Sequence, residues 1–202
     1  MTLTETTRFA DLVRGASLRG PPAAFSSTTS LRLGRAMGTV LRRQGHASTT
    51  VLVGRGTAIV DAAVRDGLVA GLVLSGLRVV DLGVIESDRF IAALRQGPDS
   101  DVRGADAWPV LGGVLVGSTG DAVGVMSFSG ARPLVGEALV GIAAVAEAGA
   151  FVAAVGGGLT VVDTALVPWP RAEIADDDDV EAIDDEDDED LANRTLSDDD
   201  DQ

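Results

Sequence analysis

Residues 111–134 read LGGVLVGSTGDAVGVMSFSGARPL and contain two apolar runs with a polar break between them. The runs at 114–116 and 123–128 are rich in branched residues, which favours β-strands. The break at 117–121, Gly-Ser-Thr-Gly-Asp, combines two hydroxyl side chains with glycines that permit a positive φ and a close approach of a ligand to the backbone. The segment therefore predicts two strands joined by a tight loop, and this loop is the first candidate for a functional site.

On both sides of this segment, short apolar runs alternate with amphipathic ones. The pattern predicts strands at 50–54, 77–82 and 110–116, and helices at 31–43, 59–75, 89–96 and 135–148. Fully apolar strands that alternate with helices are typical of a parallel sheet covered on both faces. We therefore predict an α/β fold, a three-layer α/β/α domain with a mostly parallel mixed sheet.

The two ends of the folded part are less regular in sequence. Residues 2–30 show little pattern apart from 9–15, a short segment ending in Arg14-Gly15 that we expect to close on the core. Residues 151–155 and 159–167 predict one or two final strands around a glycine hinge at 156–158. No Lys-Ser/Thr follows these glycines, so they do not indicate a P-loop. His46 is expected in a loop.

Charge divides the chain of 202 residues into a near-neutral body and an acidic tail. From residue 173 onward there are 17 of the 31 acidic residues and one of the 16 basic ones, which leaves residues 1–172 with a net charge of +1. Dense acidic runs repel one another and cannot bury enough apolar surface to offset the entropy of ordering. The sequence predicts a folded domain over 1–171 and a disordered Asp/Glu-rich tail over 172–202.

Composition also narrows the class of protein. The chain has no cysteine, which excludes disulfides, thiolate metal sites and cysteine catalysis. The N-terminus lacks a signal-peptide pattern, and no run reaches the length of a membrane span. Binding to nucleic acid is disfavoured because no basic patch and few aromatic residues are available. These features lead us to expect a cytoplasmic protein that binds neither nucleic acid nor membrane.

Several segments, in order, resemble the first domain of the α-D-phosphohexomutases, the phosphomannomutase and phosphoglucomutase family. The resemblance covers roughly residues 9–148 and rests on these pieces: 31–41 LRLGRAMGTVL, 51–55 VLVGR, 67–72 GLVAGL, 76–84 GLRVVDLGV, 112–114 GGV and 132–134 RPL. The phrase at 76–84 is the strongest single piece. The resemblance implies an α/β/α domain.

The resemblance also implies a position for a phospho-acceptor. In that family the serine that carries the phosphate lies in a Thr-Ala-Ser-His-Asn-Pro loop, and an Asn-Gly-x-Lys turn follows. The serine position falls on Thr119 here, or on Ser118 with a slip of one residue. His-Asn-Pro is missing and Met126 stands at the lysine position. The alternative interpretation is that both hydroxyl residues belong to a hairpin turn, where Ser, Thr, Gly and Asp are common.

Two arginines are the remaining landmarks of this resemblance. The family's Tyr-Asp-x-Arg-Gly appears as Leu-Val-Arg-Gly ending at Gly15, and its Gly-Arg-Asp-Thr-Arg appears as Gly-Arg-Gly-Thr-Ala at 54–58. Arg14 and Arg55 are thus candidates for an anion-binding site near the loop. Exposed or ion-paired arginines are the alternative.

The functional expectation follows from the family loops that this sequence does not contain. The family's metal loop, sugar-recognition loop and phosphate-clamping loop are not found in these 202 residues. We expect a stand-alone, degenerate phosphohexomutase domain I that is not catalytic alone and has no metal of its own. We expect it to act as a binding or regulatory module linked to sugar-phosphate metabolism. Its expected partners are a protein or a second copy, bound through open sheet edges, and a sugar phosphate. The alternative is a cryptic subunit of a split phosphohexomutase, with Mg²⁺ present if a partner chain completes the site.

Overall fold

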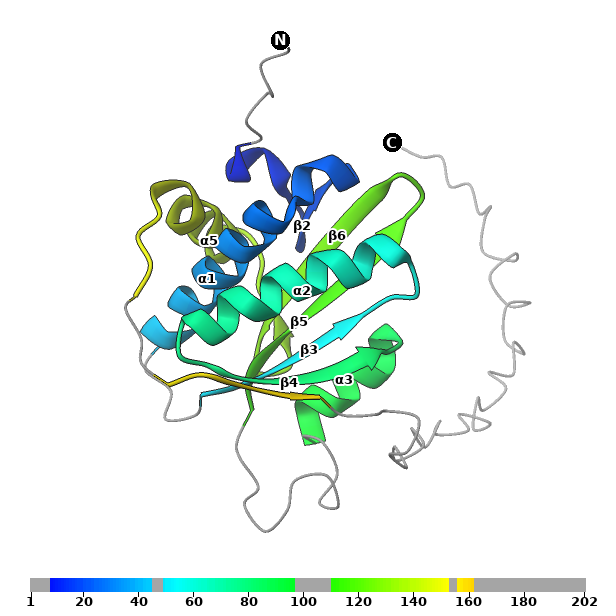
Figure 1. Ribbon diagram of the computed structural model, residues 1–202, viewed down its shortest axis with the longest axis vertical. Helices are drawn as coiled ribbons and strands as arrows, with labels where there is room; N and C mark the ends of the chain where they lie inside the picture. Colours follow the sequence, from blue (N-terminus) through cyan, green and yellow to red (C-terminus); the bar gives the residue numbers. More distant parts are fainter. Residues whose placement is uncertain (1–7, 45–48, 97–109, 153–155, 162–202) are drawn as a thin grey trace, which may run out of the picture. The chain divides into compact units, whose positions relative to one another are not determined.

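The computed structural model describes residues 8–44, 49–96, 110–152 and 156–161, all within one compact unit that spans residues 1–170 (Figure 1). A second unit, 171–202, lies outside the described residues. The disordered tail therefore stays a prediction. Among the described residues, no helix combines the length and apolar character that crossing a membrane requires.

The unit is built on one mixed sheet, in the order β1-β2-β6-β5-β3-β4-β8 with β7 paired to β6. Strands β3, β4, β5 and β8 pair in parallel, while β5, β6, β7, β2 and β1 pair antiparallel. The strands are β1 (Val13–Arg14), β2 (Ser17–Gly20), β3 (Thr50–Arg55), β4 (Arg78–Val84), β5 (Val110–Thr119), β6 (Ala122–Ser129), β7 (Arg132–Pro133) and β8 (Gly158–Val161).

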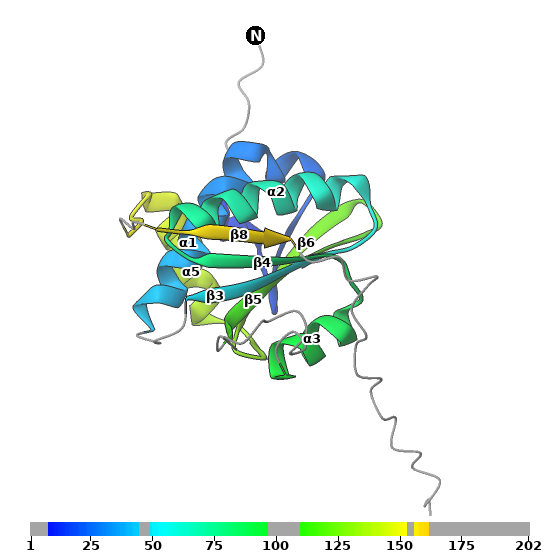
Figure 2. The ribbon, with the colours of Figure 1, turned by 60° about the horizontal axis from the view of Figure 1, so that its bottom comes forward.

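Helices cover both faces of this sheet, which confirms the predicted three-layer α/β/α class (Figure 2). Three of them, α1 (Ser27–Arg43), α2 (Ile59–Leu74) and α5 (Glu137–Ala148), lie on one face, and α3 (Ser87–Gln96) lies on the other. Two short 3₁₀ turns, Phe9–Leu12 and Pro22–Phe25, complete the N-terminal region.

Local sequence explains where the helices begin and end. At the start of α1 the Ser26 side chain accepts a hydrogen bond of 3.2 Å from the backbone N–H of Thr29, and Arg42 and Arg43 occupy its last turn. Helix α5 ends at Gly149, whose φ of +64° is the left-handed conformation that glycine adopts readily. Helix α5 ends at the predicted residue, whereas α1 begins at Ser27, four residues before the predicted start.

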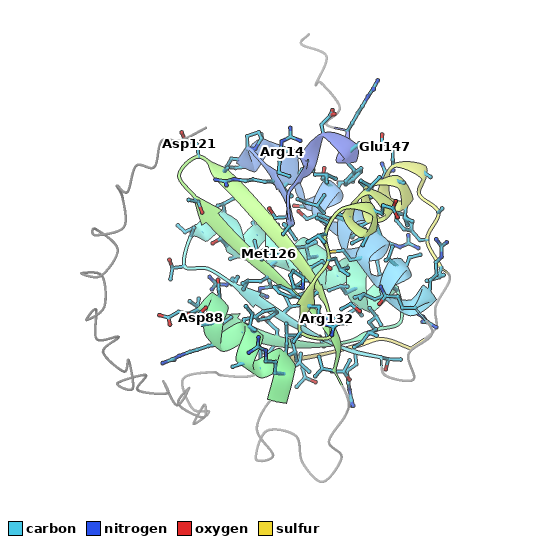
Figure 3. All side chains as sticks on the ribbon, turned by 180° about the vertical axis from the view of Figure 1, so that it is seen from behind. Arg14, Asp88, Asp121, Met126, Arg132 and Glu147 are labelled. Carbon is cyan, nitrogen blue, oxygen red and sulfur yellow. The ribbon has the colours of Figure 1, made fainter. Side chains whose placement is uncertain are left out.

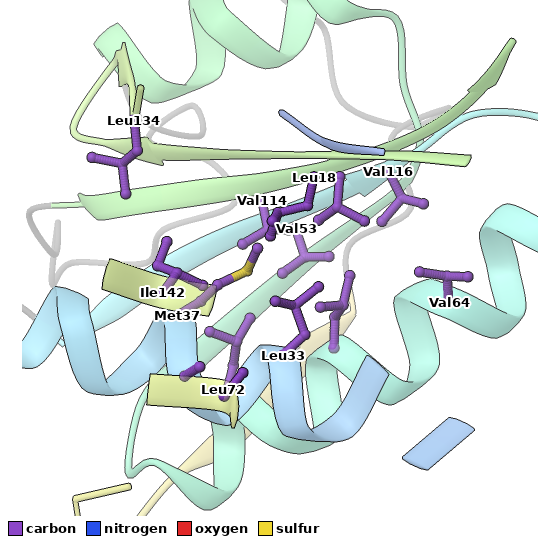
Figure 4. Close-up of a cluster of buried hydrophobic side chains, with 14 of the residues drawn as sticks. Leu18, Leu33, Met37, Val53, Val64, Leu72, Val114, Val116, Leu134 and Ile142 are labelled. Carbon is purple, nitrogen blue, oxygen red and sulfur yellow. The ribbon is translucent and has the colours of Figure 1, made fainter. Parts of the chain in front are cut away.

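Each central strand sends side chains into two cores. Val53 and Val114 point toward α1 and α2, where they meet Leu33 and Met37 in the larger core (Figure 4). Leu52, next to Val53, points the opposite way into the smaller core under α3. There the rings of Phe90 and Phe128 lie 5.7 Å apart. Burial on both faces is the reason that these strands read as unbroken apolar runs.

The structure differs from the sequence prediction at the two sheet edges. Residues 13–20 form strands β1 and β2, which the sequence pattern did not predict. In β2 Leu18 is fully buried whereas Arg19 is exposed, so too few apolar residues are present to give a periodic signal. At the other edge Phe151 and Val152 are not in a strand, β8 covers 158–161, and the rest of the predicted strands lies outside the described residues.

Helices α1 and α2 approach each other closely through glycines. A Cβ added to Gly34 on α1 would clash with the backbone of Leu68, and one added to Gly71 on α2 would clash with the carbonyl oxygen of Leu31. Both glycines face the opposite helix, so the backbones lie too close together for any side chain. The predicted apolar stripe of α1 packs against α2 only because of this spacing.

Gly34→Ala is expected to lower the free energy of unfolding by about 1–3 kcal/mol, because the added methyl group forces α1 and α2 apart. Gly141→Ala on α5 is the matched control, since nothing lies within 4 Å of a Cβ there. It should raise stability by up to about 1 kcal/mol, the helix-propensity difference between Gly and Ala. Urea unfolding followed by circular dichroism measures both, and equal stability of the two variants would contradict the close α1–α2 contact.

Candidate functional site

The loop at 117–121 is the end of a continuous β-hairpin. Strands β5 and β6 pair from Gly112 opposite Ser129 up to Thr119 opposite Ala122, which leaves Gly120 and Asp121 in the turn. The φ of Gly120 is +59°, as two-residue hairpin turns require. The predicted tight loop between two strands is confirmed, and the position that the family resemblance assigns to a phospho-acceptor lies on its last paired residues.

The two hydroxyl candidates point to opposite faces of this hairpin, as successive strand residues do. The Oγ of Ser118 donates a hydrogen bond to Oδ1 of Asp61. Thr119 is exposed at the hairpin tip. The position of the phospho-acceptor therefore matters. If it falls on Ser118, the hydroxyl is bonded to a carboxylate; if it falls on Thr119, the residue is exposed at the tip.

Asp61 is the partner that sequence reasoning missed. It lies in the first turn of α2, where the positive end of the helix favours a carboxylate, and its exposed fraction is 1%. A Cβ added to Gly56 would contact its Oδ2. The resembling motif holds an aspartate at the position of Gly56, so a carboxylate from α2 now lies next to that position. The sequence signal that could have pointed to Asp61 is its place in the first turn of a predicted helix.

The loop that leads from β3 into α2 is also tied to the hairpin. The backbone N–H of Gly56 donates a hydrogen bond of 2.8 Å to the carbonyl oxygen of Val116 on β5. This bond extends the β3–β5 pairing beyond Arg55 opposite Val116. It brings the start of α2, and with it Asp61, next to Ser118.

The two candidate arginines do not line the same groove. Arg14 is exposed, donates to the carbonyl oxygen of Val13 at 2.8 Å, and lines an open groove of about 800 Å³ together with Thr119 and Asp121. Arg55 lies on β3 beside Val116, donates to the carbonyl oxygen of Gly56 at 2.9 Å, and does not line that groove. The predicted pairing of Arg14 with Arg55 in one anion site thus stays a prediction.

A second groove lies on the α3 face of the sheet. It has a volume of about 770 Å³ and is lined by Gly117 and Gly124 of the hairpin, by Arg19 of β2 and by the first turn of α3. Met126, at the lysine position of the resemblance, is half-buried in the same groove. Figure 3 shows Met126 on the hairpin, in the view from behind that also labels Asp88 of α3.

An ion pair between α2 and β4 holds a buried carboxylate outside both grooves. Nη1 of Arg65 lies 3.1 Å from Oδ2 of Asp81, whose side chain is 3% exposed. The other carboxylate oxygen of Asp81 accepts a 3.0 Å hydrogen bond from the N–H of Gly83, which has a φ of +65°. The Asp-Leu-Gly of the 76–84 phrase therefore lies at an irregularity within β4, where the pairing with β3 shifts register between Asp81 and Val84.

The chain is similar to known proteins in both sequence and structure, although no family model matches it. A curated phosphoglucomutase/phosphomannomutase of Thermococcus kodakarensis is 38% identical over 55 residues, which are 27% of this chain and 12% of that protein. Among solved structures, a phosphoglucomutase/phosphomannomutase family protein of Burkholderia thailandensis gives a TM-score of 0.68 at 19% identity, covering 77% of this chain and 34% of its own.

A second solved structure, a putative phosphomannomutase from Thermus thermophilus, gives a TM-score of 0.56 at 25% identity, covering 75% of this chain and 33% of its own. The chain resembles phosphohexomutases over part of their length. It spans about a third of the two solved structures, and the family resemblance seen in the sequence is confirmed to that extent.

At the position of the family's phosphoserine loop, the hairpin supplies the hydroxyl of Ser118, and helix α2 supplies the carboxylate of Asp61. The Asp61 carboxylate is placed to accept a proton from Ser118. Among the hydrogen bonds and ion pairs of the described residues, none brings a cation to Ser118. Within the same residues no group of three or more His, Cys, Asp or Glu side chains could hold a metal ion.

Ser118→Ala is expected to lower the free energy of unfolding by about 1–3 kcal/mol, because the buried carboxylate of Asp61 loses its donor. Thr119→Ala, one residue away and exposed, is the matched control and should change stability by no more than about 0.5 kcal/mol. Urea denaturation gives both values. Similar losses for the two variants would show that the bond to Asp61 does not stabilise the hairpin.

Proposed function

We propose that this chain is a degenerate phosphohexomutase-like domain that does not catalyse phosphoryl transfer alone and serves in the cytoplasm as a binding or regulatory module linked to sugar-phosphate metabolism. One observation carries the proposal. Strands β5 and β6 stay paired up to Thr119 opposite Ala122, so a two-residue turn stands where the resemblance has a longer phosphoserine loop.

The chemistry of phosphoryl transfer supports this proposal. The reaction depends on positioning and on cations or metal ions that neutralise developing charge. Here Met126 replaces the lysine, and the charged partner of Ser118 is the carboxylate of Asp61, which has the wrong sign to stabilise a phosphoryl group. The solved relatives are about three times as long as the part that this chain matches.

A protein partner or a second copy would bind at an open sheet edge. Among the described strands β8 is the last of the sheet on one side, and its Leu159 and Val161 are 50% and 69% exposed. Backbone groups on an edge strand without a neighbour readily pair with another chain. This edge is therefore the surface that we assign to such a partner.

A specific observation also favours the alternative, a subunit of a split phosphohexomutase. The Ser118–Asp61 hydrogen bond pairs a potential phospho-acceptor with a proton acceptor. A partner chain would have to supply the metal loop, and Mg²⁺ held there would offset the negative charge of Asp61. In this alternative Ser118 is a better acceptor than Thr119, whose hydroxyl has no carboxylate partner among the described residues.

The purified full chain is expected to leave glucose 1-phosphate and mannose 1-phosphate unchanged in the presence of Mg²⁺, because no cation among the described residues forms a hydrogen bond with the Ser118 hydroxyl. Phosphorus NMR of the reaction mixture follows the appearance of the 6-phosphates. The Thermococcus kodakarensis relative, assayed in parallel, shows that the assay detects mutase activity. Turnover by this chain alone would overturn the proposal.

The two functions are separated by isolating the chain with its partners and analysing both by mass spectrometry. The split-enzyme alternative requires a partner that carries the metal loop, together with phosphate on Ser118 or Thr119. The binding-module proposal predicts that neither hydroxyl carries phosphate. Finding phosphate on Ser118 in a complex that contains a metal-loop partner would replace the first proposal by the second.

A further inference from the structure

The groove on the α3 face has a floor without side chains. Arg19 of β2 pairs with Gly124 of β6, which in turn pairs with Gly117 of β5, so the three residues form one row across three strands. A Cβ on Gly117 would have nothing within 4 Å, and one on Gly124 would meet only the carbonyl oxygen of Gly117 at 3.5 Å. The space above both glycines is therefore open.

This row faces away from the large core. The adjacent row, Leu18, Val125 and Val116, is fully buried on the α1 and α2 side. Strand alternation then places Arg19 on the α3 face, over the glycine floor. Helix α3 covers this face as far as Leu115 and Phe128, and its first turn borders the uncovered part.

Two arginines line this groove without a partner among the described residues. Most other described arginines are engaged: Arg32, Arg42 and Arg43 bind carbonyl oxygens, and Arg65 pairs with Asp81. Arg19 and Arg89, in contrast, are exposed and make no hydrogen bond or ion pair among the described residues. They come from segments 70 positions apart and line the same cavity.

We propose that the groove between Arg19 and Arg89 binds a small organic molecule through an oxyanion, either a phosphate group or a carboxylate. Guanidinium groups bind both in a bidentate manner, and Ser87 in the first turn of α3 lines the same space. A volume of about 770 Å³ is in the range of small-molecule sites. Arg14 and Arg55 do not line this groove.

Glu86 restricts what the groove accepts. Its side chain is exposed and lines the cavity next to Ser87 and Arg89. A carboxylate there repels a second anionic group, so the ligand carries one oxyanion on a neutral body. Leu115, Ile85 and Met126 supply the apolar wall against which that body packs.

The inference rests on the proposed function only in treating the chain as a binding module. It needs neither catalysis nor a phosphorylated Ser118, which borders the groove but whose hydroxyl is held by Asp61 of α2. Absence of anion binding would therefore leave the mutase assay unaffected, and mutase activity would leave the anion site standing.

The test is a titration of the isotope-labelled full chain with inorganic phosphate and, separately, with acetate, followed by the amide signals of Gly117 and Gly124. We expect saturable shifts with at least one anion. Comparing the two titrations shows whether the site prefers a phosphate group or a carboxylate. Arg19→Gln and Arg89→Gln should each weaken binding about threefold or more, the scale of one exposed ionic contact.

Two controls make the test specific. Arg132→Gln removes the same charge from an exposed arginine on β7 outside the groove and should leave the affinity unchanged. Gly124→Val fills the floor without changing charge and should abolish the shifts at Gly117, with its folding checked by thermal unfolding. No saturable shift with either anion, or an equal loss in Arg132→Gln and Arg19→Gln, would overturn the proposal.

Discussion

Strand β5 is the element on which both halves of the sheet depend. It pairs in parallel with β3 on one side and antiparallel with β6 on the other, so it joins the crossover half of the fold to the hairpin half. Glycines make this possible. A Cβ on Gly113 would clash with Phe90 and Leu94 of α3, and one on Gly112 would clash with the carbonyl oxygen of Phe128. The Leu-Gly-Gly-Val sequence thus lets α3 and β6 approach the same strand.

The central elements could be predicted from sequence because their signals are local. Strands buried on both faces read as apolar runs, and α1 carries a serine cap, an apolar stripe and terminal arginines within its own length. Strand β2 could not be predicted in this way. It contributes one buried side chain, Leu18, and it exists as a strand because β6 provides the pairing partner more than 100 residues later.

The same limit applies to the candidate site. The hairpin and its hydroxyls could be located in the sequence, since glycines and branched residues mark them locally. Asp61 was missed because its contact with Ser118 joins positions 57 apart and depends on the β3–α2 loop bonding to Val116. Arg19 was missed because its significance comes from the glycines of two neighbouring strands, not from residues beside it in the chain.

Because successive strand residues point to opposite faces, the Ser118–Asp61 contact and the groove lined by Arg19 lie on opposite sides of the hairpin. Ser118 faces the core side, where Asp61 holds its hydroxyl, while Gly117 and Gly124 face the groove side with Arg19. A substitution at Ser118 therefore acts on the Asp61 side of the hairpin, and a substitution at Arg19 acts on the groove side. Since the hairpin is paired to its tip, it cannot rearrange to bring the Ser118 hydroxyl into the groove without breaking the pairing of Ser118 with Val123. The continuous pairing that leaves a two-residue turn at the hairpin tip also holds Gly117 opposite Gly124 in the floor of the groove.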